Sequence, residues 1–129
     1  MNILFLIGRL VFGGFFVRSG IMHFKNLNGM AGYAASKGTP YPKAAVAGSG
    51  LLITLGGLGV ILGIMPQLSL AMIVAFLIPV SFTMHDFWKI EDREHKMMQQ
   101  TNFMKNIALA AAALMMLSIP VPWIYSLVK

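Results

Sequence analysis

The chain contains no cysteine and few charged residues. Only 11% of its 129 residues are charged, against about a quarter in ordinary soluble domains. The absence of cysteine excludes structural disulfides, thiolate metal sites and CxxC redox chemistry. The shortage of charge disfavours a soluble enzyme, a disordered regulator and a secreted scaffold. With 57% apolar residues and a mean hydropathy of +0.75, the composition predicts one domain in a lipid bilayer.

Acidic side chains are especially scarce. The chain has four, against ten Lys and Arg and a net charge of +6, and the four acids all lie in one short segment: Asp86, Glu91, Asp92 and Glu94. The basic residues are scattered along the chain rather than clustered as a nucleic-acid patch would be. Cationic connections beside an anionic lipid leaflet explain the charge better. We expect a lipid bilayer and no nucleic acid as partner.

Four apolar stretches approach the length of about 20 residues that a membrane helix needs. They cover residues 2–22, 44–64, 68–84 and 105–127. The first lacks the basic region and cleavage site of a signal peptide. The sequence therefore predicts an all-α membrane fold, a single integral membrane domain over residues 1–129. Its architecture would be a four-transmembrane-helix bundle with short interfacial helices in the two long connections, the first of them between Asn26 and Gly38.

The charges also predict an orientation. An even number of spans places both termini on one face and the two long connections, about 23–43 and 85–105, on the other. The positive-inside rule makes the face with more Lys and Arg cytoplasmic, so both termini are expected outside, in a multi-pass protein of the cell (inner) membrane. The cationic residues of the long connections are Lys25, Lys37, Lys43, Lys89, Arg93, Lys96 and Lys105.

Small residues favour close helix packing. The second stretch is rich in glycine and includes the GxxxG pair Gly59 and Gly63, and the fourth carries the alanine-rich run 108–113. Such residues let helix backbones approach each other in a membrane. They do so within one chain or between copies, which leaves a homo-oligomer open. The spacing GxGxxG of a nucleotide-binding loop is absent.

Two arginines lie within the first apolar stretch, where an ionisable group is costly and suggests a function. Arg9 and Arg18 are nine positions apart, about 13 Å and half a rotation along a helix, so they face different directions. Both could extend to the lipid headgroups. Arg18 lies near the charged connections. Arg9 has no acidic side chain at its end of the helix, so its partner would be the terminal carboxylate, backbone carbonyls, a lipid phosphate, a ligand or another subunit.

Two histidines meet at the predicted cytoplasmic rim, because the first and third spans both end there. The sequence places Arg18, Asp86, Trp88, Lys105 and Asn106 in the same region as His23 and His85. This set suits a quinone headgroup, since His, Arg or Asn can donate to its carbonyls and His with Asp can handle a proton. Two rim histidines are also commonly ordinary surface groups. A haem or zinc site is disfavoured because neither histidine lies within a span.

The order of the motifs resembles the DoxX family of small four-helix membrane proteins. The similarity covers nearly the whole chain and is carried by Gly8-Arg9-Leu10, Phe16, Ser19-Gly20, the segment 30–38 with Pro40 and Pro42, the glycine-rich second stretch, His85-Asp86-Phe87-Trp88 and the segment 102–109. The resemblance implies a four-helix bundle associated with quinone-linked oxidoreductases or with soluble redox partners. Arg9, His85, Asp86, Trp88, Lys105 and Asn106 fall on recurring family positions, whereas Arg18 departs from the pattern.

Three functions follow from these observations. The first is a small membrane subunit of a quinone-linked oxidoreductase, with a candidate quinone, ligand or partner site formed by Arg9, Arg18, His23, His85, Asp86, Trp88, Lys105 and Asn106. The second is a non-catalytic anchor or accessory protein that docks a soluble redox partner through the charged connection. The third is a small transporter, which the lack of a carboxylate within a span disfavours. We expect no metal site, and no catalysis by the chain alone, because the sequence shows no electron carrier.

Overall fold

The computed structural model describes residues 2–127, and it is entirely helical over that range apart from turns and loops. Five α-helices and one 3₁₀ helix follow in order: α1 (Asn2–Lys25), α2 (Leu27–Ser36), α3 (Pro42–Leu62), α4 (Pro66–Met84), η1 (Phe87–Lys89) and α5 (Arg93–Met116). The all-α fold is as predicted, and the helix expected between Asn26 and Gly38 is present as α2.

Three helices are long and apolar enough to cross a membrane. They are α1, α3 and the segment Pro66–Lys89 that begins with α4, and they correspond to the predicted spans 2–22, 44–64 and 68–84. The helix boundaries follow from local sequence: α3 and α4 each begin on a proline, and α3 ends at Gly63 with a positive φ of 70°, the left-handed conformation that favours glycine.

The fourth predicted span, 105–127, differs from the structure. Helix α5 starts at Arg93, twelve positions earlier, where Asp92 accepts a hydrogen bond from the backbone N–H of His95 (2.9 Å). It ends at Met116 because the segment that follows contains Pro120 and Pro122, which interrupt helical hydrogen bonding. The average hydropathy of α5 is too low for a membrane span, so α5 is not among the candidate spans within residues 2–127. A continuous helix to Leu127 is therefore wrong, and the four-span arrangement stays a prediction.

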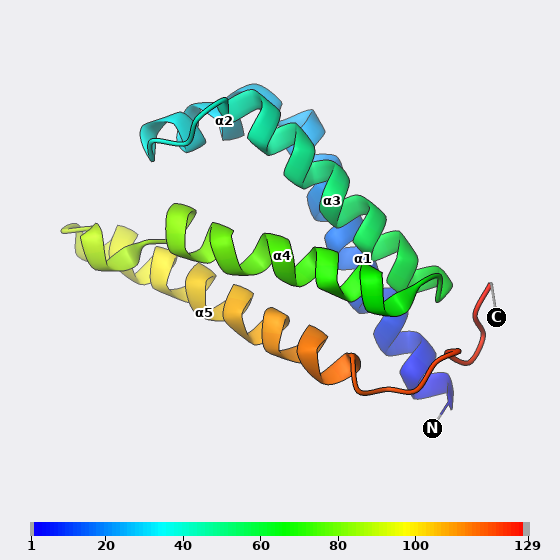
Figure 1. The fold of residues 1–129 in the computed structure, drawn as a ribbon. Helices are drawn as coiled ribbons and strands as arrows, with labels where there is room; N and C mark the ends of the chain where they lie inside the picture. Colours follow the sequence, from blue (N-terminus) through cyan, green and yellow to red (C-terminus); the bar gives the residue numbers. More distant parts are fainter. Residues whose placement is uncertain (1, 128–129) are drawn as a thin grey trace.

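The helices form two pairs that diverge in a V (Figure 1). One arm consists of α1 packed on α3, with α2 at its open end, and the other consists of α4 packed on α5. The arms meet near the turn between α3 and α4, where both ends of the chain also lie. Buried Phe16, Ile53, Leu70, Ile73 and Leu77 fill the junction.

Glycines allow α1 and α3 to lie unusually close. A Cβ atom at Gly13 would lie 2.6 Å from the carbonyl oxygen of Gly57, and a Cβ at Gly57 would lie 2.6 Å from that of Gly13. One further pair, Gly20 and Gly50, repeats the arrangement about two turns along. Close glycine packing is therefore present within the chain, between the first and second spans, through Gly50 and Gly57. The GxxxG pair lies elsewhere, because Gly59 faces Ser69 of α4 and Gly63 ends α3.

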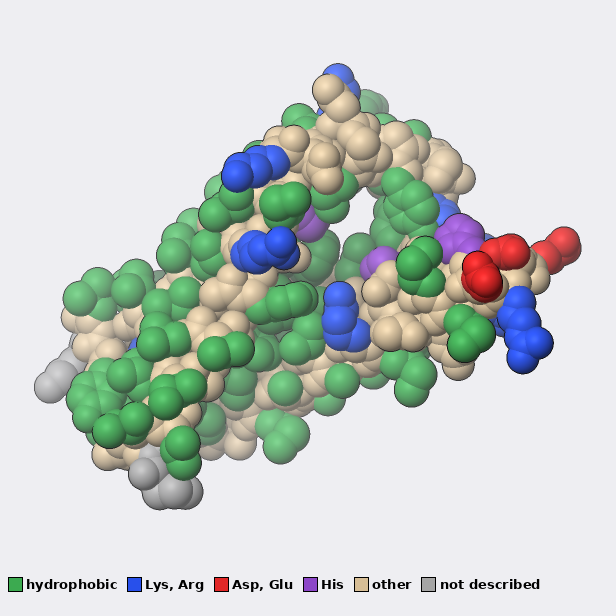
Figure 2. Space-filling view, turned by 180° about the vertical axis from the view of Figure 1, so that it is seen from behind, with side chains coloured by type: hydrophobic (Ala, Val, Ile, Leu, Met, Phe, Trp, Pro, Cys, Tyr) green, Lys and Arg blue, Asp and Glu red, His purple; other side chains and the backbone are tan. Residues whose placement is uncertain are grey.

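Charged residues concentrate at the open end of the V. Figure 2 shows Lys, Arg, Asp, Glu and His side chains around the ends of the two arms, while hydrophobic side chains cover the closed end. Large apolar side chains are exposed along α1, α3 and α4, among them Leu4, Val11, Leu51 and Phe82. Exposure of this extent is expected of a surface that faces lipid.

Candidate functional site

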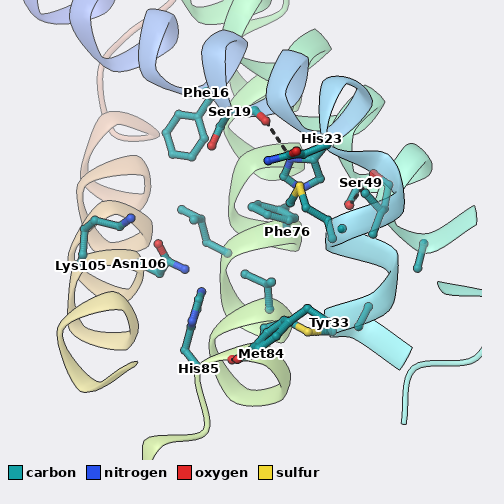
Figure 3. A pocket seen from close by; sticks show the side chains of 18 of the residues that line it. Phe16, Ser19, His23, Tyr33, Ser49, Phe76, Met84, His85, Lys105 and Asn106 are labelled. Atoms are coloured by element: carbon teal, nitrogen blue, oxygen red, sulfur yellow. Dashed lines mark hydrogen bonds between the residues drawn. The ribbon is translucent and has the colours of Figure 1, made fainter. Parts of the chain in front are cut away.

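A cavity of about 450 Å³ lies between the two arms of the V. Its volume is within the range of pockets that hold a small organic ligand. All five α-helices contribute to its lining, and Figure 3 shows side chains from both arms converging on it. The walls are mainly apolar, with Phe16, Phe76, Leu77 and Val80 among them. The polar side chains that reach it are Ser19, His23, Asn26, Tyr33, Ser49, His85, Lys105 and Asn106.

His23 enters the cavity from the last turns of α1 and is 7% exposed. Its Nδ1 donates a hydrogen bond to the carbonyl oxygen of Ser19 at 2.7 Å, and its ring meets the edge of Phe76 at 5.6 Å between centroids. A carbonyl can only accept, so Nδ1 must carry the proton. A neutral His23 therefore keeps its lone pair on Nε2.

His85 enters from the other arm, directly after the last residue of α4. Its Nδ1 lies 2.6 Å from Oε1 of Gln99 on α5. An amide oxygen also only accepts, so a neutral His85 again carries its lone pair on Nε2. Gln99 is buried, which fixes the ring between α4 and α5.

Asn106 and Lys105 complete the polar side of the cavity from α5 (Figure 3). Asn106 is 7% exposed, yet within residues 2–127 its side-chain amide makes no hydrogen bond to the protein. The Lys105 ammonium lies 5.5 Å from the ring centroid of Phe15. The cavity thus combines two imidazoles, an amide and an ammonium with apolar walls, an arrangement that suits a flat ring with polar atoms at its edge.

Asp86 does not join the two histidines. Where His85 turns toward α5, Asp86 turns toward α2, and its Oδ1 accepts a hydrogen bond from Lys37 Nζ at 2.6 Å. This hydrogen bond to Asp86 raises the pKa of Lys37 above the ordinary lysine value. The expected proton-handling pair of His with Asp86 is therefore not formed; Asp86 joins the ends of α2 and α4.

Arg18 and Trp88 also lie off the cavity lining. Arg18 is exposed on α1, as expected of a long side chain near a helix end. Trp88 is 46% exposed and packs in an aromatic cluster with Phe82, Phe87 and Phe103. Half-exposed aromatic residues at a helix end are typical of anchors at the membrane interface.

Arg9 lies at the closed end, remote from the cavity, and is 1% exposed. Its guanidinium donates to the carbonyl oxygens of Val60 (3.1 Å) and Ile61 (2.9 Å) and to that of Ile124. It also lies about 5.5 Å from the ring of Trp123. The carbonyls at the end of α3 lack partners within the helix, so Arg9 satisfies them and holds the C-terminal segment. Of the partners that the sequence allowed, the structure shows backbone carbonyls.

Three residues that position the site were not predicted as part of it. The Tyr33 hydroxyl donates to the carbonyl oxygen of Met84 at 2.7 Å, Lys37 pairs with Asp86, and Gln99 holds His85. Tyr33 and Lys37 lie one turn apart at the end of α2, a spacing that indicates a shared contact surface. No pattern in the sequence predicts the role of Gln99, because the fourth helix was expected to begin at residue 105, after Gln99.

Comparison with known families and proteins gives one match. A family model described as DoxX matches residues 4–86, and no match was found among curated proteins or solved structures. The matched segment includes His23, His85 and Asp86, whereas Trp88, Lys105 and Asn106 lie beyond it. Among residues 2–127 no cluster of three or more His, Cys, Asp or Glu side chains could hold a metal ion.

Proposed function

The chain belongs to the DoxX family of membrane proteins, and from this premise and the cavity we propose that it is a membrane subunit that binds a quinone headgroup for a quinone-linked oxidoreductase. The observation that carries the proposal is Asn106, a residue 7% exposed whose side-chain amide lines the same cavity as His23 and His85 and makes no hydrogen bond to the described protein. A ligand in the cavity would give this amide a partner.

The polar groups fit both forms of such a ring. Quinone carbonyls accept hydrogen bonds, and Asn106 and Lys105 are donors at the cavity. A quinol hydroxyl donates, and neutral His23 and His85 each offer an Nε2 lone pair, because Nδ1 is already engaged. Bound there, the ring would supply the electron-accepting chemistry that the side chains lack. The two histidines would orient it and exchange its protons, while Phe16 and Phe76 exclude water.

Electrons would reach the site from another protein. An exposed segment of mixed charge lies at the open end of the V next to η1, in which the acids Glu91, Asp92 and Glu94 alternate with Lys89, Arg93 and Lys96. This surface suits a soluble redox partner whose charges are complementary to that pattern. The accessory role and the quinone site are therefore two parts of one proposal, in which a quinone held by the chain would accept electrons from a docked partner and the chain does not catalyse alone.

The test is binding of a tail-less benzoquinone or naphthoquinone to the purified protein in mild detergent, measured by equilibrium dialysis. Asn106→Leu keeps the number and branching of the side-chain heavy atoms and removes the amide, so we expect about tenfold weaker binding, equivalent to one hydrogen bond of about 1.4 kcal/mol. Gly29→Leu, placed at the cavity in open space, should also weaken binding by obstruction.

Gly32→Leu is the matched control for Gly29→Leu. Gly32 also lies on α2 with no atom near its Cβ position, but it does not line the cavity, so binding should stay within twofold of wild type. Equal affinity in wild type, Asn106→Leu and Gly29→Leu would contradict the proposed site.

A further inference from the structure

A second hollow lies beside the cavity, on the outer side of the gap between α3 and α4. It is a groove of about 540 Å³. Its α3 side is built from the small residues Ala45, Gly48 and Ser49 together with Leu52, and its α4 side includes Ala75, Phe76, Pro79 and Val80. The segment 37–40, which begins with Lys37, lies at one end. Small residues on α3 leave this space open, and a Cβ at Gly48 would meet no atom within 4 Å.

The groove and the cavity lie against each other. They share five lining residues, Ala45, Ser49, Phe76, Val80 and Met84. Figure 3 shows Ser49 and Phe76 facing the cavity from α3 and α4. The same side chains thus form the inner wall of the groove and the outer wall of the cavity, and only their thickness separates the two.

We infer that this groove is the passage through which the apolar tail of a membrane-soluble ligand leaves the cavity for the bilayer. The inference rests on the proposed function, since the ring of that ligand would occupy the cavity. A cavity of about 450 Å³ accommodates a drug-sized ring but not a long isoprenoid tail in addition. The tail must therefore leave the cavity on one side.

The gap between α3 and α4 suits the tail better than the gap between α1 and α5. Both α3 and α4 belong to candidate spans, and the groove between them is mostly apolar. The groove has a lysine at one end, Lys37, but this lysine is paired with Asp86. The other side carries the Lys105 ammonium, which forms no ion pair within residues 2–127 and would oppose an apolar chain. An apolar tail gains little free energy when it moves from lipid into the groove, because lipid tails are as apolar as the groove. The groove therefore adds little to the affinity for the ligand, but it sets the path of the tail and limits its thickness.

The inference selects the ligand class: a ring joined to a flexible isoprenoid tail. Gly48→Leu should place a side chain in the groove, starting from a Cβ that meets no protein atom within 4 Å. In nanodiscs, we expect it to weaken binding of a benzoquinone with a long isoprenoid tail at least tenfold, while binding of the same ring without a tail stays within twofold of wild type. Gly14→Leu is the control, because Gly14 has equally open space and lines neither hollow.

The outcomes separate the two proposals. If the tail-less ring fails to bind the wild-type protein, the proposed function is wrong, and the inferred passage, which depends on it, is wrong as well. If the ring binds and Gly48→Leu leaves the long-tailed ligand unaffected, or weakens both ligands equally, the passage is wrong while the headgroup site stands.

Discussion

At the scale of single residues, the two arginines of α1 differ in every respect that decides their roles. Arg9 is buried and donates to three backbone carbonyls, two of them at the end of α3, where a positive charge also complements the helix dipole. Arg18 is exposed on the same helix. The sequence places both within an apolar stretch, but only packing against α3 and residues 123–124 distinguishes them.

Arg9→Met should lower the free energy of unfolding by about 2–4 kcal/mol, because it leaves buried carbonyls without donors. The measurement is SDS-induced unfolding in mixed micelles, followed by tryptophan fluorescence, which also reports on Trp123 beside the guanidinium. Arg18→Met is the control and should change stability by less than about 0.5 kcal/mol. Equal losses in the two variants would show that Arg9 has no special structural role.

The sequence predicts the positions of some polar residues at the rim and misplaces others. Because the first and third spans end on the same side, the sequence predicts that His23 and His85 lie near each other. Both line one cavity in the structure, together with Lys105 and Asn106 from α5. Asp86 and Trp88 come one and three positions after His85, so the sequence predicts that they belong to the same site. The chain leaves helical geometry after Met84, however, and the side chain of Asp86 pairs with Lys37, 49 positions away. The local spacing of residues does not predict a contact between positions so far apart in the chain.

At the scale of helices, the close contact of α1 with α3 depends on glycines at matched positions. Hydropathy gave the extent of α1, α3 and α4 to within a few residues, because each is bounded by proline, glycine or charge. It failed for α5, whose polar first turns, Arg93 to Gln99, resemble a loop but form a helix with Asp92 as its N-cap.

Gly13→Ala and Gly14→Ala are adjacent substitutions with opposite expectations. The methyl group at Gly13 would meet the Gly57 carbonyl, whereas that at Gly14 enters open space. We expect Gly13→Ala to destabilise the protein by about 1–3 kcal/mol and Gly14→Ala to be neutral or slightly stabilising, since alanine favours a helix. Thermal unfolding by circular dichroism measures both. A neutral Gly13→Ala would contradict the close packing of α1 on α3.

At the scale of the whole molecule, the V shape creates the cavity. Two tightly packed pairs of helices meet at a closed end held by Arg9 and diverge toward the charged end, where α2 bridges to α4 through Tyr33 and Lys37. The sequence predicted the helices and the two termini at one end, but not the divergence, which depends on how the pairs pack. The cytoplasmic orientation of the charged end stays a prediction from the positive-inside rule.

The most direct measurement of the central claim is photoaffinity labelling with an azido-quinone in native membranes, with the attachment sites mapped by mass spectrometry. The account predicts labelling of cavity residues on α1, α2 and α5, displacement by excess unlabelled quinone, and weaker labelling in Asn106→Leu at a probe concentration below saturation. Labelling confined to lipid-facing positions, or unchanged by competitor and by Asn106→Leu, would contradict it.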